Sequence, residues 1–134
     1  MITGFLDTNI LIYAYDPLNP SKQVVARDLV RSASLGFNFI SAQVLIEFSA
    51  ALIHKKRMNP TEVSLMLGEL WPIPFVGTDS ALVKRAIEAH SVYGAHFYDG
   101  LIIAAAERCG CSRIWSEDFN PGQKYFGIEV VNPF

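Results

Sequence analysis

The sequence of 134 residues is poor in cysteine and in charge. Its two cysteines, Cys109 and Cys111, are separated by one residue, which makes a disulfide between them implausible. No further Cys or His lies close enough in the sequence to complete a zinc site, so we interpret both as packing residues. Charged residues make up only 18% of the chain and hydrophobic residues 51%, a balance that excludes disorder and predicts a substantial core.

Two other absences bear on location and partners. No apolar run approaches the roughly 20 residues that a bilayer-spanning helix needs. The first residues, MITGFLDTN, lack the basic start and the small-residue cleavage site of a signal peptide, so we expect a cytoplasmic protein without a membrane partner. The net charge of −2 argues against a broad basic face that coats nucleic acid. It leaves open an enzyme that meets phosphates through bound metal ions.

Short apolar runs alternate with helical patterns, and no linker, repeat or low-complexity tract interrupts them. We therefore expect one domain over residues 1–134. The predicted strands cover residues 2–6, 37–40, 73–76, 113–115 and 128–131. The predicted helices follow Asn19-Pro20, Ser41, Asn59-Pro60 and Thr78 or Asp79, and the last covers residues 98–108. This alternation predicts an α/β fold with a parallel sheet covered on both faces.

Three acidic residues fall where such a sheet binds its ligands. Asp7 directly follows the first predicted strand, and Asp118 follows the fourth. Ligands of open α/β sheets bind beyond the carboxyl ends of the strands, and Asp99, in the first turn of its helix, is expected at the same edge. Taken singly, Asp7 could cap a helix that starts at Thr8, Asp99 could stabilise a helix N-terminus, and Asp118 could form a turn.

Glu47 is harder to explain as a structural residue. It lies inside a predicted helix, among the apolar residues of VLIEF, and borders the face that is expected to pack on the core. A charge in that position is unfavourable unless it is paired or binds a metal ion. We therefore group Glu47 with the three aspartates as candidate catalytic and metal-binding residues.

Four carboxylates that lie close together need a cation between them, because like charges raise one another's pKa values. The natural ion for an all-oxygen site is Mg²⁺ or Mn²⁺, and such a site suits hydrolysis of a phosphodiester by an activated water. Thr8 and Asn9 are expected to orient Asp7 or the phosphate, and Ser116 to hold a metal-bound water or to position Asp118. Glu117 adjoins Asp118, so the sequence leaves open which of the two is the fourth acid.

Four segments in this order resemble the PIN domain, and most of all the VapC-type toxins of toxin–antitoxin pairs. The segments are FLDTNILIYAYD at the start, QVLIEFSAAL, FYDGLIIAAAERCG and, near the end, WSEDF. Asp7, Glu47 and Asp99 match the most dependable acidic positions of the family, and Asp118 matches a more variable fourth. Thr8, Asn9 and Ser116 match accessory polar positions.

The resemblance implies a PIN-like three-layer α/β/α sandwich with a central parallel sheet of about five strands. It also implies a ribonuclease that depends on Mg²⁺ or Mn²⁺. The partners implied are an RNA substrate, a second copy of the chain in a homodimer, and a small antitoxin that inserts a segment near the acidic site.

Other interpretations remain open at this point. A PIN-like module that binds RNA or a partner without cutting would share the same segments. A phosphoacceptor receiver domain is disfavoured because no Lys follows the last predicted strand, and an Asp-nucleophile phosphatase because Asn9 stands where its second Asp belongs. The weaker candidates for phosphate contacts are Lys22, Arg27, Arg31, Lys55, Lys56 and Arg57, and those for base stacking are Tyr13, Tyr15 and Phe97.

Overall fold

The computed structural model describes residues 3–120 and 122–134, and these form one six-stranded sheet in the order β3-β2-β1-β4-β6-β5. The strands are β1 (Gly4–Leu6), β2 (Asn38–Ser41), β3 (Phe75–Val76), β4 (Arg113–Trp115), β5 (Lys124–Tyr125) and β6 (Ile128–Val131). All neighbours pair in parallel except β5, which runs antiparallel to β6 at one edge. Residue 2 of the first predicted strand lies outside the described residues.

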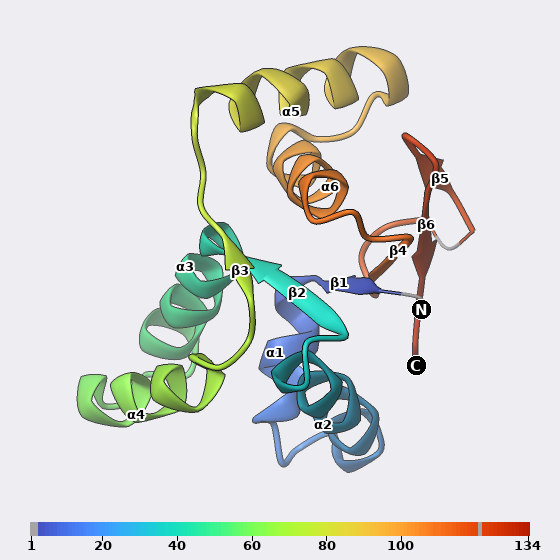
Figure 1. Ribbon diagram of the computed structural model, residues 1–134. Coiled ribbons are helices and arrows are strands. Elements are labelled where there is room, and N and C mark those ends of the chain that lie inside the picture. Colours follow the sequence, from blue (N-terminus) through green and yellow to red (C-terminus); the bar gives the residue numbers. More distant parts are fainter. Residues whose placement is uncertain (1–2, 121) are drawn as a thin grey trace.

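Helices cover both faces of the sheet, as Figure 1 shows. They are α1 (Thr8–Ala14), α2 (Pro20–Ser34), α3 (Ala42–Ala50), α4 (Pro60–Leu70), α5 (Ser80–Tyr93) and α6 (Phe97–Arg108), and α3 continues into a π-helical turn, η1 (Ala51–Lys55). The pair α5 and α6 lies on one face, and α1 and α2 lie on the other, with α3 and α4 beyond them toward the β3 edge. The predicted three-layer α/β/α sandwich is thus confirmed, with one more strand than expected.

Most predicted helix starts are confirmed by their caps. The Ser41 hydroxyl accepts from the amide of Val44, the Asn59 side chain accepts from that of Thr61, and Asp79 accepts from that of Leu82. Asn19 was expected to cap α2, and this prediction was wrong: Pro20 begins the helix, but the Asn19 side chain donates to Asp16 instead. Pro at the first helical position is enough to set this start, because its fixed φ already suits a helix.

The core lies on both sides of the central strands. Phe5, Leu6 and Ile114 of β1 and β4 are fully buried, as is the middle of α6 around Ile103. Cys111 is buried and Cys109 packs against the same core, so the interpretation of the cysteines as packing residues is confirmed. Among the described residues, no helix has both the length and the apolar character that crossing a membrane requires.

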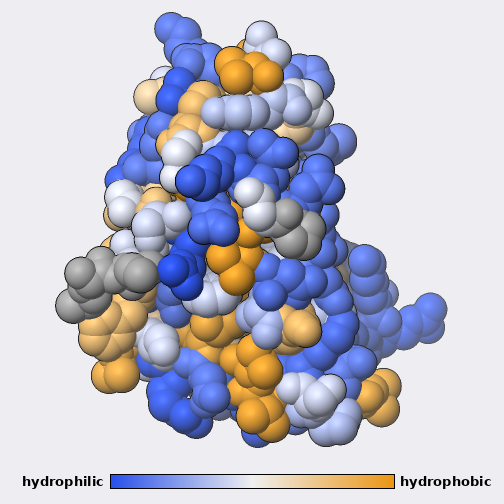
Figure 2. Space-filling model, turned by 90° about the vertical axis from the view of Figure 1, so that its right-hand side faces the viewer, coloured by the Kyte–Doolittle hydropathy of each residue, from blue (hydrophilic) through white to orange (hydrophobic). Residues whose placement is uncertain are grey.

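Exposed hydrophobic side chains are spread over several elements, and four of them lie on α3, on α4 and around β3. Ile46, Leu65, Trp71 and Phe75 are at least half exposed, and the rings of Trp71 and Phe75 lie 6.2 Å apart. Figure 2 shows the face on the opposite side, toward β5 and β6, where hydrophilic residues dominate and hydrophobic ones are most numerous in the lower half of the view.

Gly100 allows α5 and α6 to pack closely. A Cβ added at Gly100 would lie 2.7 Å from the carbonyl oxygen of Ala86 on α5, so the backbone of one helix would have to shift to make room for it. The close approach of two backbones accounts for glycine in the first turns of an otherwise apolar helix, directly after Asp99.

Replacing this glycine with alanine tests the close packing. Gly100→Ala is expected to lower the free energy of unfolding by about 1–2 kcal/mol, because overpacking outweighs the gain in helix propensity. Gly68→Ala is the matched control: Gly68 also lies inside a helix, but its added Cβ meets nothing within 4 Å. That variant should be more stable by up to about 1 kcal/mol. Urea unfolding measures both, and equal stabilisation by the two substitutions would contradict the close contact.

Candidate active site

The parallel pairing of β1 with β4 brings the first acidic residue beside Ser116. Leu6 stands opposite Trp115 in the register, so Asp7 and Ser116 follow as neighbours at the carboxyl ends of the two strands. The Asp7 amide donates to the carbonyl of Trp115 over 3.1 Å, and the Ser116 hydroxyl donates to Asp7 Oδ2 over 2.7 Å. Both residues are buried. This is the sheet edge at which the sequence placed the site.

A second set of contacts joins Asp7 to the helix that carries Glu47. Asp7 caps α1, because its Oδ1 accepts from the amide of Thr8 over 2.8 Å. The Thr8 hydroxyl in turn donates to Glu47 Oε2 over 3.0 Å. Glu47 Oε1 accepts from Gln43, one turn earlier in α3, over 2.6 Å. Glu47 is half-buried and is held by two neutral donors. It has no cationic partner among the residues that the structure describes.

Asp118 connects the two halves of the acidic edge, by which we mean Asp7, Glu47, Asp99 and Asp118 at the carboxyl ends of the central strands. Its Oδ2 accepts from Asn9 over 2.9 Å, and its amide donates to the Ser116 hydroxyl over 3.1 Å. Asp118 lines an open pocket of 520 Å³ together with Thr8, Asn9 and Glu47. It also lines a smaller pocket of 190 Å³ that contains Asp99. Asp118 thus lies between Glu47 on one side and Asp99 on the other.

The carboxylates are close enough to influence one another's ionisation. The pKa of Asp7 is raised from 3.8 to about 6. Burial is the main cause, the charges of Asp118 and Glu47 add to it, and the hydrogen bonds from Ser116 and Thr8 oppose it. The pKa of Asp99 is also raised, first by desolvation of its carboxyl group and then by Asp118 and Glu47, while nearby His96 lowers it. Across residues 3–120 and 122–134, however, no three acidic, His or Cys side chains converge tightly enough to form a ready metal cage.

Glu117 points to a different cluster from Asp118. It forms an ion pair with Lys22 of α2 and accepts from the Tyr13 hydroxyl over 2.6 Å. These two hydrogen bonds lower the pKa of Glu117. The C-terminal Phe134 packs edge-on against the Tyr13 ring, with centroids 5.1 Å apart, and Lys22 lies over both rings. Glu117 therefore anchors the loop after β4, and of the two adjacent acids only Asp118 contacts the acidic network.

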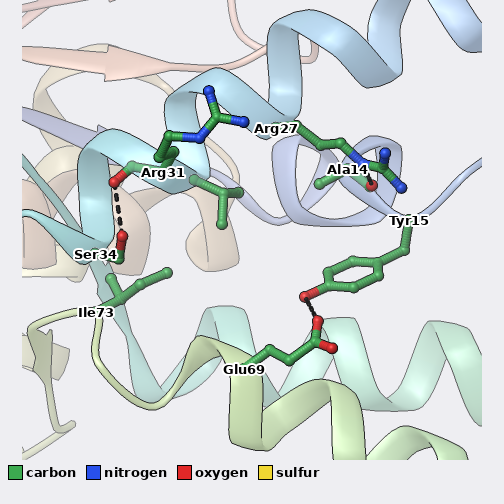
Figure 3. A pocket seen from close by; sticks show the side chains of 8 residues that line it. Ala14, Tyr15, Arg27, Arg31, Ser34, Glu69 and Ile73 are labelled. Atoms are coloured by element: carbon green, nitrogen blue, oxygen red, sulfur yellow. Dashed lines mark hydrogen bonds between the residues drawn. The ribbon is translucent and has the colours of Figure 1, made fainter.

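Two of the predicted cations line a pocket that contains none of the four acids. Figure 3 shows Arg27 and Arg31 on α2 at the rim of this 330 Å³ pocket. The Tyr15 hydroxyl donates to Glu69 across it over 2.9 Å, and Arg27 Nε donates to the carbonyl of Ala14 over 3.0 Å. Arg27 and Arg31 thus lie away from the acidic edge. The candidates for base stacking, Tyr13, Tyr15 and Phe97, all pack against the hydrophobic core.

Sequence reasoning missed Gln43, which connects Glu47 to the other half of the site. Gln43 Nε2 donates to Glu47 and also to the carbonyl of Tyr98 over 3.1 Å, at the start of the helix that carries Asp99. The spacing of four residues between Gln43 and Glu47 on one helix was the available signal. The contact with Tyr98 had no such signal, since the two residues lie 55 positions apart in the sequence.

Comparison with known proteins identifies the fold family. The sequence profile of the PIN domain matches residues 4–126, which is nearly the whole chain. The chain belongs to the PIN domain family. This assignment excludes the receiver-domain and phosphatase interpretations. No curated protein sequence matches the chain.

Solved PIN-fold structures at low sequence identity support the same fold. A toxin–antitoxin complex from Klebsiella pneumoniae is 19% identical, covers 98% of each chain and has a TM-score of 0.74. The sarcin–ricin-loop-cleaving toxin VapC20 of Mycobacterium tuberculosis is 16% identical over 87% of this chain and 90% of its own, with a TM-score of 0.65. FitAcB from Neisseria gonorrhoeae is 19% identical over 98% of each chain, also with a TM-score of 0.65.

The raised pKa of Asp7 predicts an unusual pH dependence in metal-free buffer. The folded chain holds the Asp7 proton up to about pH 6, whereas the unfolded chain releases it near pH 3.8, so this contribution to stability is lost as the pH rises through that range. Asp7→Asn removes the charge and should be more stable than the unsubstituted protein at neutral pH by about 1–3 kcal/mol.

Urea unfolding at a series of pH values between about 4 and about 7 measures this effect. Asp28→Asn on the exposed surface of α2 is the control for loss of one negative charge, and it should not reproduce the stabilisation. A lower stability of Asp7→Asn than of the unsubstituted protein at neutral pH would contradict the assigned environment of Asp7.

Proposed function

We propose that this PIN domain is a divalent-metal-dependent endoribonuclease whose acidic residues are Asp7, Glu47, Asp99 and Asp118. The observation that carries the proposal is their arrangement: the four come from four separate segments, and Asp118 lines one pocket with Glu47 and another with Asp99. Hydrogen bonds through Ser116 and Thr8 join Asp7 to this group. A structural role for each acid alone does not explain why all four occur at one edge of the sheet.

The chemistry of the donor set fits Mg²⁺ or Mn²⁺. Every candidate ligand is an oxygen, which hard divalent cations prefer. Asn9 Oδ1, beside Asp118, is buried and has no hydrogen-bond partner in the part of the chain that is described. Each carboxylate oxygen that already accepts one hydrogen bond keeps a further lone pair for a cation. When bound, the ion supplies charge stabilisation to the phosphate and makes a water molecule more acidic.

The polar neighbours hold the acids in position for this role. Ser116 and the Thr8 amide fix the two oxygens of Asp7, while Thr8 and Gln43 fix those of Glu47. Asn9 holds Asp118. Groups in hydrogen bonds of this kind orient metal ligands and raise their affinity. Thr8, Asn9 and Ser116 are therefore proposed as positioning residues, and Glu117 as the anchor of the loop that carries Asp118.

A PIN domain that binds RNA or a partner without cutting is the second candidate. The observation that favours it is the lack of a tight cluster of three ligands among the described side chains. The two functions differ in a simple way, because only the nuclease requires a divalent ion and an ionised Asp7.

The nuclease proposal predicts cleavage of single-stranded RNA in Mg²⁺ or Mn²⁺ and its loss with a chelator. Asp7→Asn and Asp118→Asn should each lower kcat/KM by about a hundredfold or more, because each removes a carboxylate from the site. Glu117→Gln is the matched control, since it neutralises the adjacent acid while its amide oxygen can still accept from Tyr13 or Lys22 and so keep the loop anchored. Its loss of activity should be clearly smaller than that of Asp118→Asn.

Cleavage rates of a labelled RNA oligonucleotide measure these differences. Cleavage that persists with a chelator and in the Asp7→Asn variant would refute the nuclease function. Equal losses in Glu117→Gln and Asp118→Asn would contradict the assignment of Asp118 as the fourth acid.

We also propose that the protein is the toxin of a VapBC-type pair, acts in the cytoplasm and forms a homodimer. The support is its similarity to a structure described as a toxin–antitoxin complex and to VapC20, which is described as a toxin. The proposal predicts a small neighbouring reading frame whose product binds the homodimer and blocks RNA cleavage. Light scattering of the purified pair and inhibition assays measure this, and a neighbouring product that fails to bind would remove the toxin role.

A further inference from the structure

The larger pocket at the acidic edge has basic side chains that the proposed nuclease site does not use. His54 and Lys55 line it together with Glu47 and Asp118, and both are exposed. They belong to η1, the π-helical turn that continues α3. A π turn within an α-helix is rare and is frequently found at functional sites. The pocket volume of 520 Å³ also falls within the range of about 300–1,000 Å³ typical of ligand pockets.

The π turn changes which residues share a face with Glu47. In a regular α-helix, a residue eight positions after Glu47 would be rotated about 80° away from it. In η1 the amide of Lys56 instead donates to the carbonyl of Ala51, five residues earlier, so one extra residue is needed to complete the turn. That extra residue brings Lys55 back toward the face of Glu47, in agreement with its place in the pocket lining.

The three consecutive cations Lys55, Lys56 and Arg57 have different surroundings. Lys55 lines the acidic pocket and has no ion-pair partner among residues 3–120 and 122–134. Lys56 pairs with Asp16 over 3.7 Å and is not among the pocket residues. Arg57 has a φ of 51°, in the left-handed region, and ends the helical segment. Favourable interaction with the helix dipole would apply to all three, so it does not explain why Lys55 alone turns to the pocket.

We propose that Lys55, with His54 beside it, binds the phosphate backbone of the RNA strand next to the site of cleavage. This inference rests on the proposed ribonuclease function and adds a substrate-binding subsite to it. A phosphodiester strand approaching four carboxylates is repelled, and a cation at the rim offsets that repulsion. The pocket also has an apolar wall of Ile12, Ala50 and Ala51, against which the adjacent nucleotide can pack.

Binding of RNA tests the subsite independently of cleavage. The probe is a fluorescein-labelled single-stranded RNA oligonucleotide, and every variant carries Asp7→Asn so that the RNA stays intact. Lys55→Gln is expected to raise Kd about threefold to tenfold and to reduce the slope of log Kd against log salt by about 0.7, as for one phosphate contact. Lys55→Arg keeps the charge and should bind nearly as well as Lys55. His54→Gln should raise Kd by a smaller factor.

Lys56→Gln is the matched control, because it removes the same charge from the next residue without touching the pocket. Its Kd and salt slope should stay unchanged. Equal effects of Lys55→Gln and Lys56→Gln, or none in either, would overturn the subsite while leaving the nuclease proposal intact. If the Asp7→Asn protein binds no RNA at all, both the subsite and the proposed RNA substrate are wrong.

Discussion

The parallel pairing of β1 with β4 is the contact on which the acidic edge depends. It places Asp7 and Ser116 side by side at the carboxyl ends of adjacent strands, although 109 residues separate them in sequence. From Asp7 the network extends through Thr8 to Glu47, and from Ser116 to the amide of Asp118. In the sheet, β2 lies on one side of β1 and β4 on the other, so the strand order reverses between β1 and β4. The acidic residues lie at the carboxyl ends of these two strands, which is where open α/β folds bind ligands.

This network also keeps negative charge in a place where burial is unfavourable. Asp7 is 7% exposed, and its hydrogen bonds from Ser116 and Thr8 only partly offset the rise in its pKa. The free energy lost at neutral pH can be recovered when a cation binds, since a ligand that binds only the folded state stabilises it. The raised pKa of Asp7 and the proposed affinity of the site for a divalent ion thus have the same cause, which is the burial of several carboxylates close together.

The sequence predicted those parts of the fold that depend on local signals. Caps at Ser41, Asn59 and Asp79 and the apolar runs of β1, β4 and β6 are such signals. It missed β5, because Lys124–Tyr125 is too short for a detectable alternation of apolar and polar residues. At the site, the positions of Asp7 and Asp118 could be predicted because each follows the end of a predicted strand. Contacts between distant segments, such as Lys22 with Glu117, and the π turn that redirects Lys55, had no local signal.

The central claim is that the carboxylates of separate segments share a divalent cation. The most direct test is an anomalous difference map from crystals soaked in Mn²⁺. We expect a peak at the acidic edge, within coordination distance of Asp7 or Asp118 and at least one further carboxylate of the four. A map from fully soaked crystals with no peak at this edge, or with Mn²⁺ bound only elsewhere on the protein, would contradict it.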